Sequence, residues 1–85
     1  MDATLTQGVR AFQRGHYEEA LRLLAPLAEQ GEVRAQVILA RLYYAGNGVE
    51  QSDERHLYWL ERAADNGDKA ARSRVKKLRR KELHS

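Results

Sequence analysis

Apolar residues recur every three or four positions in five successive segments of the chain. This spacing places them on one side of a helix, as in helices that are half buried against their neighbours. The segments with this pattern are residues 3–14, 17–30, 33–45, 53–66 and 69–81. The sequence therefore predicts an all-α fold of about five helices.

The ends of these segments carry residues that favour helix termini. A glycine follows each of the first four segments, where a helix ends most readily with a residue at positive φ. These glycines are Gly15, Gly31, Gly46 and Gly67. Ser52 or Asp53 is the expected N-cap of the fourth helix, and Asp68 that of the fifth. Pro26 lies inside the second segment, where it predicts a kink or an early end.

The chain contains an internal repeat. The stretch LRLLAPLAEQGEVRAQVILARL aligns without a gap with LYWLERAADNGDKAARSRVKKL, at an offset of 36 residues. Residues of the same kind coincide at core-type spacing in the pairs Leu21/Leu57, Leu24/Leu60, Ala28/Ala64, Ala35/Ala71, Leu39/Val75 and Leu42/Leu78. The alignment predicts two copies of one helical hairpin, each covering the apolar side of its neighbour.

The stretch LARLYYAGNGV followed by WLERAADNG resembles the Sel-one-like repeat, a helix pair of the tetratricopeptide type. The residues that occupy the positions of the family pattern are Leu39, Tyr43, Gly46, Gly48, Val49, Trp59, Ala63, Ala64 and Gly67. The departures are Ala40 for a glycine, Ser52 for an aspartate, Arg55 for a lysine and His56 for a small alanine. His56 is expected to loosen the contact between the two helices or to change its angle. The upstream stretch RAFQRGHYEEALRLLAPLAEQG is more similar to a plain tetratricopeptide pair.

The resemblance implies a single domain over residues 1–85, built of antiparallel helix pairs stacked as a short right-handed α-solenoid. Its expected parts are a degenerate repeat over about 3–31, a full repeat over about 33–67 and a capping helix over about 68–82. The family's general role implies a protein–protein interaction module, an adaptor or scaffold, rather than an enzyme.

About two repeats are near the minimum for a stable stack, so a weak homodimer through an exposed end or edge is expected. Val37 and Ile38 cannot both be buried by the intrachain pattern, and one of them is expected to mark that contact.

The loop Gly46-Asn47-Gly48 has a structural interpretation. Gly46 ends a helix, Asn47 and Gly48 tolerate a left-handed backbone, and Val49 packs back against the helix pair. A phosphate-binding loop would follow a strand or end in Gly-Lys-Ser/Thr, and the sequence has neither feature here.

Composition narrows the chemistry. The chain has no cysteine, which excludes disulfides, thiolate metal sites and thiol nucleophiles and fits a cytoplasmic location. The N-terminus does not resemble a secretory signal, and no run of eighteen apolar residues predicts a membrane span. A soluble protein without a membrane partner is expected.

No catalytic residue, metal or cofactor is predicted. His16, His56 and His84 lie on separate segments, and none has a His, Asp or Glu partner three or four residues away together with an apolar second shell. The adjacent acids Glu18-Glu19 and Asp53-Glu54 lie in first helical turns, where the helix dipole favours anions.

The charge is asymmetric along the chain. Residues 1–68 hold seven Lys/Arg and eleven Asp/Glu, whereas residues 69–85 hold eight Lys/Arg and one Glu. Some residues of the first, third and fifth helices belong neither to the core stripe nor to a loop, and these are expected to line the concave side of the solenoid. They are Thr6, Arg10, Gln13, Arg34, Val37, Arg41, Tyr44, Ser73, Lys77 and Arg80. Five of these ten are cationic and none is acidic, and arginine forks suit carboxylates.

We therefore expect a basic groove that binds an acidic segment or a C-terminal carboxylate of another protein. The candidate partner-binding residues are Arg10, Arg34, Arg41, Tyr44, Lys77 and Arg80. Two alternatives stay open. The arginines can serve only to keep the surface soluble, or the basic C-terminal run RSRVKKLRRKELHS can contact nucleic-acid phosphates.

Overall fold

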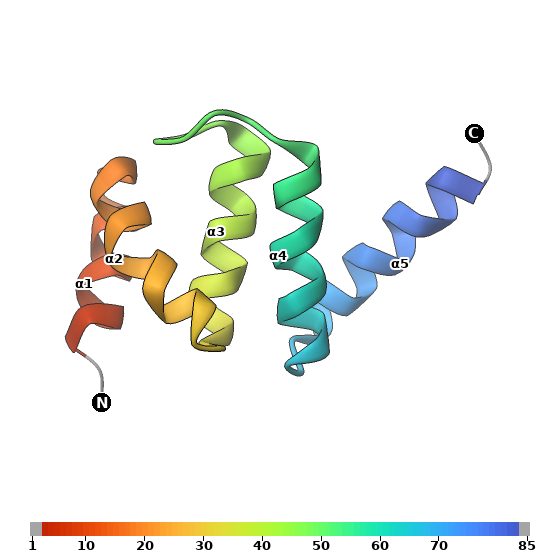
Figure 1. Ribbon diagram of the computed structural model, residues 1–85, viewed down its shortest axis with the longest axis horizontal. Helices are drawn as coiled ribbons and strands as arrows, with labels where there is room; N and C mark the ends of the chain where they lie inside the picture. The colour runs from red at the N-terminus through yellow and green to blue at the C-terminus, as the bar shows by residue number, and fades with distance from the viewer. Residues whose placement is uncertain (1–2, 84–85) are drawn as a thin grey trace.

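The five amphipathic segments form five α-helices in the structure, a computed structural model that describes residues 3–83. They are α1 (Ala3–Gln13), α2 (Tyr17–Glu29), α3 (Val33–Ala45), α4 (Asp53–Asp65) and α5 (Lys69–Leu83). Each helix packs on the next in chain order, so the colours in Figure 1 run from one end of the molecule to the other. The all-α class is confirmed, and every helix end lies within two residues of its prediction.

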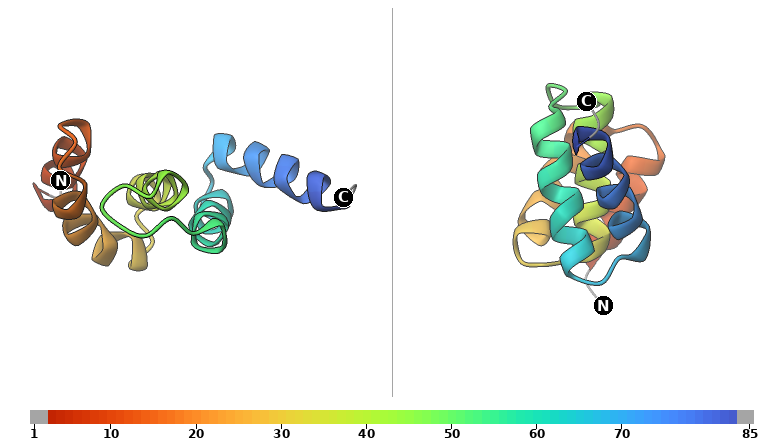
Figure 2. Two further views of the ribbon diagram at one scale, coloured as in Figure 1. Left: turned by 90° about the horizontal axis from the view of Figure 1, so that it is seen from above. Right: turned by 90° about the vertical axis from the view of Figure 1, so that its right-hand side faces the viewer.

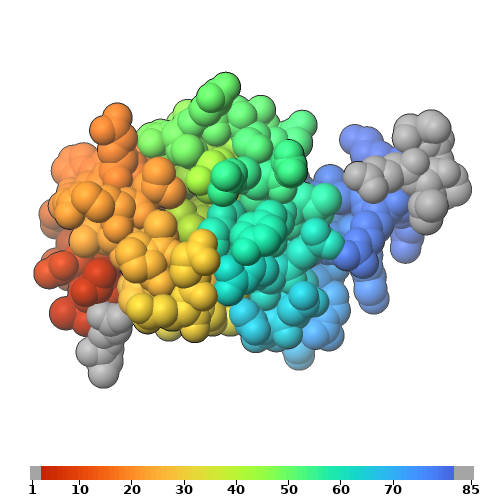
Figure 3. Space-filling model, in the orientation of Figure 1, coloured from red at the N-terminus to blue at the C-terminus, as the bar shows by residue number. Residues whose placement is uncertain are grey.

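The molecule is elongated, with principal extents of 42 × 26 × 18 Å. α5 packs against α4 and leads away from the other helices in the view from above (Figure 2). In the space-filling view α5 stands out from the body formed by the first four helices (Figure 3). One side of α5 is therefore left open to solvent.

The core is a single cluster of mostly aliphatic side chains. Leu24, Leu39 and Leu42 are fully buried in it, and burying each such side chain contributes roughly 1.5–3 kcal/mol. Buried Gly8 of α1 lies so close to α2 that a Cβ atom added there would come within 2.4 Å of Leu24 Cδ2. The close contact of the first two helices therefore depends on Gly8, which the sequence pattern did not single out.

The local geometry repeats at the predicted offset. The bounds of α2 shifted by 36 residues are those of α4, and the start of α3 shifts onto the start of α5. The turn after α2 is closed by a hydrogen bond from Glu32 N to Leu27 O at 3.0 Å. The bond from Asp68 N to Ala63 O at 3.0 Å closes the turn after α4 in the same way. The two hairpins thus share both helix bounds and turn geometry.

The loop between α3 and α4 uses two glycines at positive φ, Gly46 at 72° and Gly48 at 71°. Asn47, which was expected to tolerate a left-handed backbone, does not adopt one, because among the described residues only glycines have positive φ. Gly48 supplies the second turn itself and brings the loop against the first residues of α2. Val49 packs on the core, as predicted.

The helix starts are capped largely as predicted. Ser52 Oγ accepts a hydrogen bond from Arg55 N at 3.1 Å, and Asp68 Oδ2 accepts one from Ala71 N at 2.8 Å. α2 continues past Pro26 to Glu29, so the proline does not end the helix early.

None of the helices in residues 3–83 is both long enough and apolar enough to cross a lipid bilayer.

Candidate functional site

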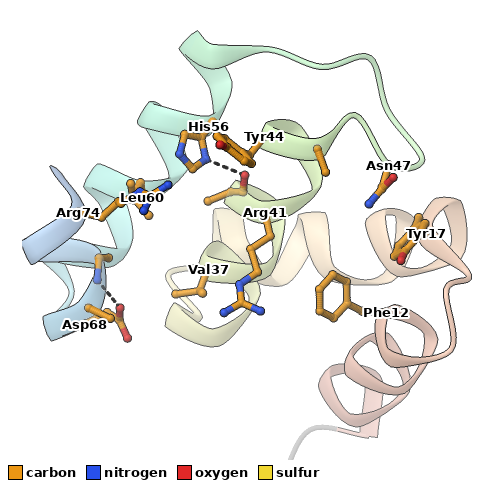
Figure 4. A pocket seen from close by; sticks show the side chains of 14 residues that line it. Phe12, Tyr17, Val37, Arg41, Tyr44, Asn47, His56, Leu60, Asp68 and Arg74 are labelled. Atoms are coloured by element: carbon orange, nitrogen blue, oxygen red, sulfur yellow. Dashed lines mark hydrogen bonds between the residues drawn. The ribbon is translucent and has the colours of Figure 1, made fainter. Parts of the chain in front are cut away.

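The structure contains an open cleft of about 540 Å³ to which all five helices contribute. One of its walls is a face of α3, the opposite wall is the first half of α5, and α4 forms the floor between them (Figure 4). Phe12 of α1 and Tyr17 of α2 close the end of the cleft away from α5. Most of the lining side chains are apolar or aromatic.

The α3 wall follows from helix periodicity. Val37, Arg41 and Tyr44 are four and three residues apart, which places them on one side of the helix. The other side of α3 carries the buried Leu39 and Leu42, so the helix cannot rotate without exposing its core face. Arg41 and Tyr44 were predicted to bind a partner, and both line the cleft. Tyr44 is 56% exposed, an unusually open position for a large ring.

Arg74 is a cleft residue that sequence reasoning missed. Its guanidinium carbon lies 6.0 Å from the centre of the Tyr44 ring, so α3 and α5 meet here through a cation and an aromatic face. The expected α5 residues were Ser73, Lys77 and Arg80, but Ala70, Ala71 and Arg74 line the cleft instead. The side of α5 that faces α3 depends on how the two helices cross, and residue spacing does not encode that angle.

The remaining predicted residues lie elsewhere. Arg10 borders a separate depression between α1 and α2, with Arg14 and Arg22 nearby. Arg34 lies in the first turn of α3, and Lys77 and Arg80 lie further along α5. All three are exposed, and none of them lines the cleft. The structure therefore brings together Arg41 and Tyr44 but not the whole predicted set.

One acidic residue does line the cleft, contrary to the prediction of a surface without acids. Asp68 faces the cleft at the start of α5, where its carboxylate caps the helix through Ala71 N (Figure 4). The arginines that form ion pairs among the described residues are Arg22, Arg62 and Arg79, so Arg41 and Arg74 have no carboxylate partner there. Both guanidinium groups are available to a ligand.

Comparisons of the chain with protein-family models, curated proteins and solved structures gave no match. What the cleft can bind follows from its own residues.

Two guanidinium groups that have no carboxylate partner among the described residues lie beside an exposed aromatic ring, and this arrangement suits a carboxylate that is next to an apolar side chain. An arginine fork donates two parallel hydrogen bonds to a carboxylate, and the aromatic and aliphatic walls accept the apolar neighbour. Val37 is half buried in this wall, whereas Ile38 is buried in the core. Val37 is thus the one of the two that remains available for contact with another molecule.

His56 links the floor of the cleft to the α3 wall. Its Nδ1 lies 2.8 Å from Ala40 O, and because a carbonyl oxygen can only accept, Nδ1 carries the proton. The ring also lies 5.0 Å from the Tyr44 ring, centre to centre. The sequence predicted that His56 loosens or re-angles the contact between the helices. In the structure its ring links the two helices through a hydrogen bond and lies next to the Tyr44 ring.

No three metal-ligating side chains converge within the described part of the chain. His16 lies near Glu19 on the surface of α2, at 3.9 Å, and His56 is held by Ala40. His84 lies outside the described residues.

The basic side chains of α5 are exposed to solvent. Every lysine and arginine of residues 69–81 is exposed, while Ala71 and Val75 are buried and Leu78 is half buried. The predicted amphipathic stripe is therefore present, and the cations cover the rest of the helix. Arg79 forms an ion pair with Glu61 of α4.

Proposed function

We propose that this protein is a non-catalytic interaction module whose cleft binds a short segment of another protein through a carboxylate. The observation that carries the proposal is the placement of Arg41 and Arg74, both without an ion-pair partner in the described part of the chain, on opposite walls of one cleft. The cleft lies within the size range of ligand-binding pockets, about 300–1,000 Å³. Tyr44, Phe12 and Val37 provide the apolar surface that a bound segment needs beside its charge.

The architecture we propose is a short right-handed α-solenoid of the Sel-one-like and tetratricopeptide type. The shared helix bounds and turn geometry of the two hairpins support it. In solenoids of this type the first helix of each pair lines the concave side, where partners bind. Here α3 and α5 form the walls of the cleft, which matches that position.

The ligand's charge is the feature to test first. Eight-residue peptides with aspartate and glutamate are compared with the same peptides carrying asparagine and glutamine, each with a free and an amidated C-terminus. We expect the acidic peptides to bind more tightly, because a hydrogen bond to a charged group contributes about 1.5–3 kcal/mol. Weaker binding after amidation alone would identify the C-terminal carboxylate as the group that is bound.

Replacing Arg41 or Arg74 by glutamine should weaken binding of the acidic peptides by about tenfold or more, measured by fluorescence anisotropy. The neutral peptides should be affected little. Arg14→Gln is the matched control, because it removes the same charge from an exposed site outside the cleft. Equal affinity for acidic and neutral peptides, or an equal loss in the Arg14→Gln variant, contradicts the proposal.

A further inference from the structure

The second feature with a binding chemistry of its own is a groove on the opposite side of α5. It has a volume of about 280 Å³. We call it the end groove, and it is lined by Glu61, Ala64, Asp65, Arg72, Val75, Lys76 and Arg79. Shifted back by 36 residues, its two helices α4 and α5 correspond to α2 and α3. The equivalent surface of the α2–α3 pair is covered by α4, so the internal repeat shows what kind of element such a surface accepts.

On α3 the surface that α4 covers is a neutral stripe. Its members are Gln36, Ala40 and Tyr43, at spacings of four and three residues. Gln36 Oε1 accepts a hydrogen bond from Asn66 Nδ2 at 3.2 Å, Ala40 O accepts one from His56 Nδ1, and Arg55 lies over the Tyr43 ring at 5.9 Å. These contacts define the positions that face the stripe, which are Arg55 and His56 of α4 and Asn66 directly after its last residue.

On α5 the corresponding stripe is cationic. Arg72, Lys76 and Arg79 stand 36 positions after Gln36, Ala40 and Tyr43, and all three are exposed. Arg79 is paired with Glu61, whereas the structure gives Arg72 and Lys76 no ion pair with any acid among residues 3–81. A helix with α4's own residues would place an arginine against Arg79 and a histidine against Lys76. Like charges in contact destabilise such a complex, so the end groove selects against a neutral or basic helix.

The α4 wall of the end groove keeps the opposite charge. In the first repeat Arg62 of α4 donates to Glu29 O at 3.2 Å and lies 3.7 Å from the Glu29 carboxylate. Asp65 occupies the place of Glu29 in the second repeat and is exposed. An arginine at the Arg62 position of a helix bound in the end groove would therefore face Asp65, as Arg62 faces Glu29. The groove is specific for a pattern of charges and is not uniformly basic.

We propose that the end groove binds an acidic amphipathic helix of a partner protein, laid on α5 as α4 lies on α3. The helix carries an arginine that faces Asp65. Four residues after this arginine it carries an acid that faces Arg72. Six and seven residues before the arginine it carries acids that face Lys76 and Arg79, respectively. This second surface is separate from the cleft and does not depend on the proposed function.

The test uses a peptide of residues 52–67 in which Arg55, His56 and Asn66 are each replaced by glutamate. The unaltered 52–67 peptide is the matched control, because it presents the same apolar side and the same arginine. We expect the acidic peptide to bind the full chain at least about tenfold more tightly, since each new ion pair contributes a factor of up to about five. The two affinities are measured by fluorescence anisotropy at constant ionic strength.

The protein variants locate the binding. The double variant Arg72→Gln, Lys76→Gln should lower the affinity for the acidic peptide by about tenfold. The double variant Lys77→Gln, Lys81→Gln removes the same charge from a different side of α5 and should change it less than about threefold. Arg41→Gln reports any share of the peptide that binds in the cleft, and it should change the affinity much less than the double variant Arg72→Gln, Lys76→Gln does. A loss in Arg41→Gln instead would place the peptide in the cleft, which overturns the end groove and leaves the proposed function intact.

Two further results contradict the proposal. The first is equal binding of the acidic and unaltered peptides, including no binding of either at millimolar concentration. The second is displacement of the acidic peptide by duplex DNA, with equal losses in both double variants. That result would make α5 a surface for polyanions such as nucleic acid, without preference for a helix.

Discussion

Replacing Gln36 by glutamate should destabilise the protein by about 4 kcal/mol at pH 7. Gln36 is a fully buried polar residue whose Nε2 donates to Ala28 O at 3.0 Å and whose Oε1 accepts from Asn66, so it joins α2, α3 and α4. A carboxylate in its place points an unpaired charge at a carbonyl oxygen in the core. The new group escapes this only by taking up a proton, which costs about 1.4 kcal/mol for each of the roughly 2.7 pH units above its ordinary pKa of about 4.3.

The sign of the pH dependence follows from the same argument. Burial raises the pKa of the new carboxyl in the folded state, and the protonated form can donate to Ala28 O as glutamine does. The destabilisation should therefore be smallest near pH 4 and should grow as the pH rises toward 7. Urea unfolding of both proteins at several pH values measures it.

Gln36→Met is the matched control, with a similar volume and no charge. It should cost only about 1–2 kcal/mol with no added pH dependence, because Ala28 O still accepts a hydrogen bond from Gly31 N. If Gln36→Glu is as stable as Gln36→Met at pH 7, the site is open to water and Gln36 is not the buried link between three helices.

Gly48→Ala should destabilise the fold by about 2–5 kcal/mol. Gly48 has a φ of 71°, and an added Cβ atom would lie 2.7 Å from the backbone carbon of Tyr17 and 2.8 Å from Glu18 N. The left-handed backbone costs an alanine roughly 1–2 kcal/mol, and the overlap with the start of α2 adds a further 1–3 kcal/mol. Such a loss is a large part of the stability of a small domain, about 5–15 kcal/mol in total.

Gly15→Ala separates the two effects. Gly15 also has a positive φ, 82°, but nothing lies within 4 Å of the added Cβ atom. Thermal or urea unfolding should show only the backbone cost there, about 1–2 kcal/mol. Equal losses at the two glycines would mean that the loop does not rest on α2.

The comparison of Gly48 with Gly46 shows where sequence reasoning stops. Both glycines are identified as turn residues from their place between apolar segments. That Gly48 also lies against Tyr17 follows from packing between a loop and a helix 31 residues earlier, which no local pattern contains. Gly8 is a similar case, because its proximity to Leu24 depends on how α1 crosses α2.

The sequence predicted the cleft residues of α3 but not those of α5. Arg41 and Tyr44 were found because α3 is packed on both sides, by α2 and α4, so that its spacing determines which residues stay exposed. α5 packs on α4, and its exposed cations are distributed around the helix, so spacing alone could not distinguish Arg74 from Lys77. The 36-residue offset, in contrast, also relates the helices in the structure. Comparing α3 and α5 position by position at this offset therefore identifies the end groove.

The proposed function requires that a carboxylate-bearing segment binds between Arg41 and Arg74. Titration of the ¹⁵N-labelled protein with the acidic eight-residue peptide tests this most directly, because each amide reports its own surroundings. We expect the largest shifts on α3 around Arg41 and Tyr44 and on α5 around Arg74, and we expect them to saturate together. Shifts confined to α2 and the outer side of α4, or spread evenly along α5, would contradict the proposed function.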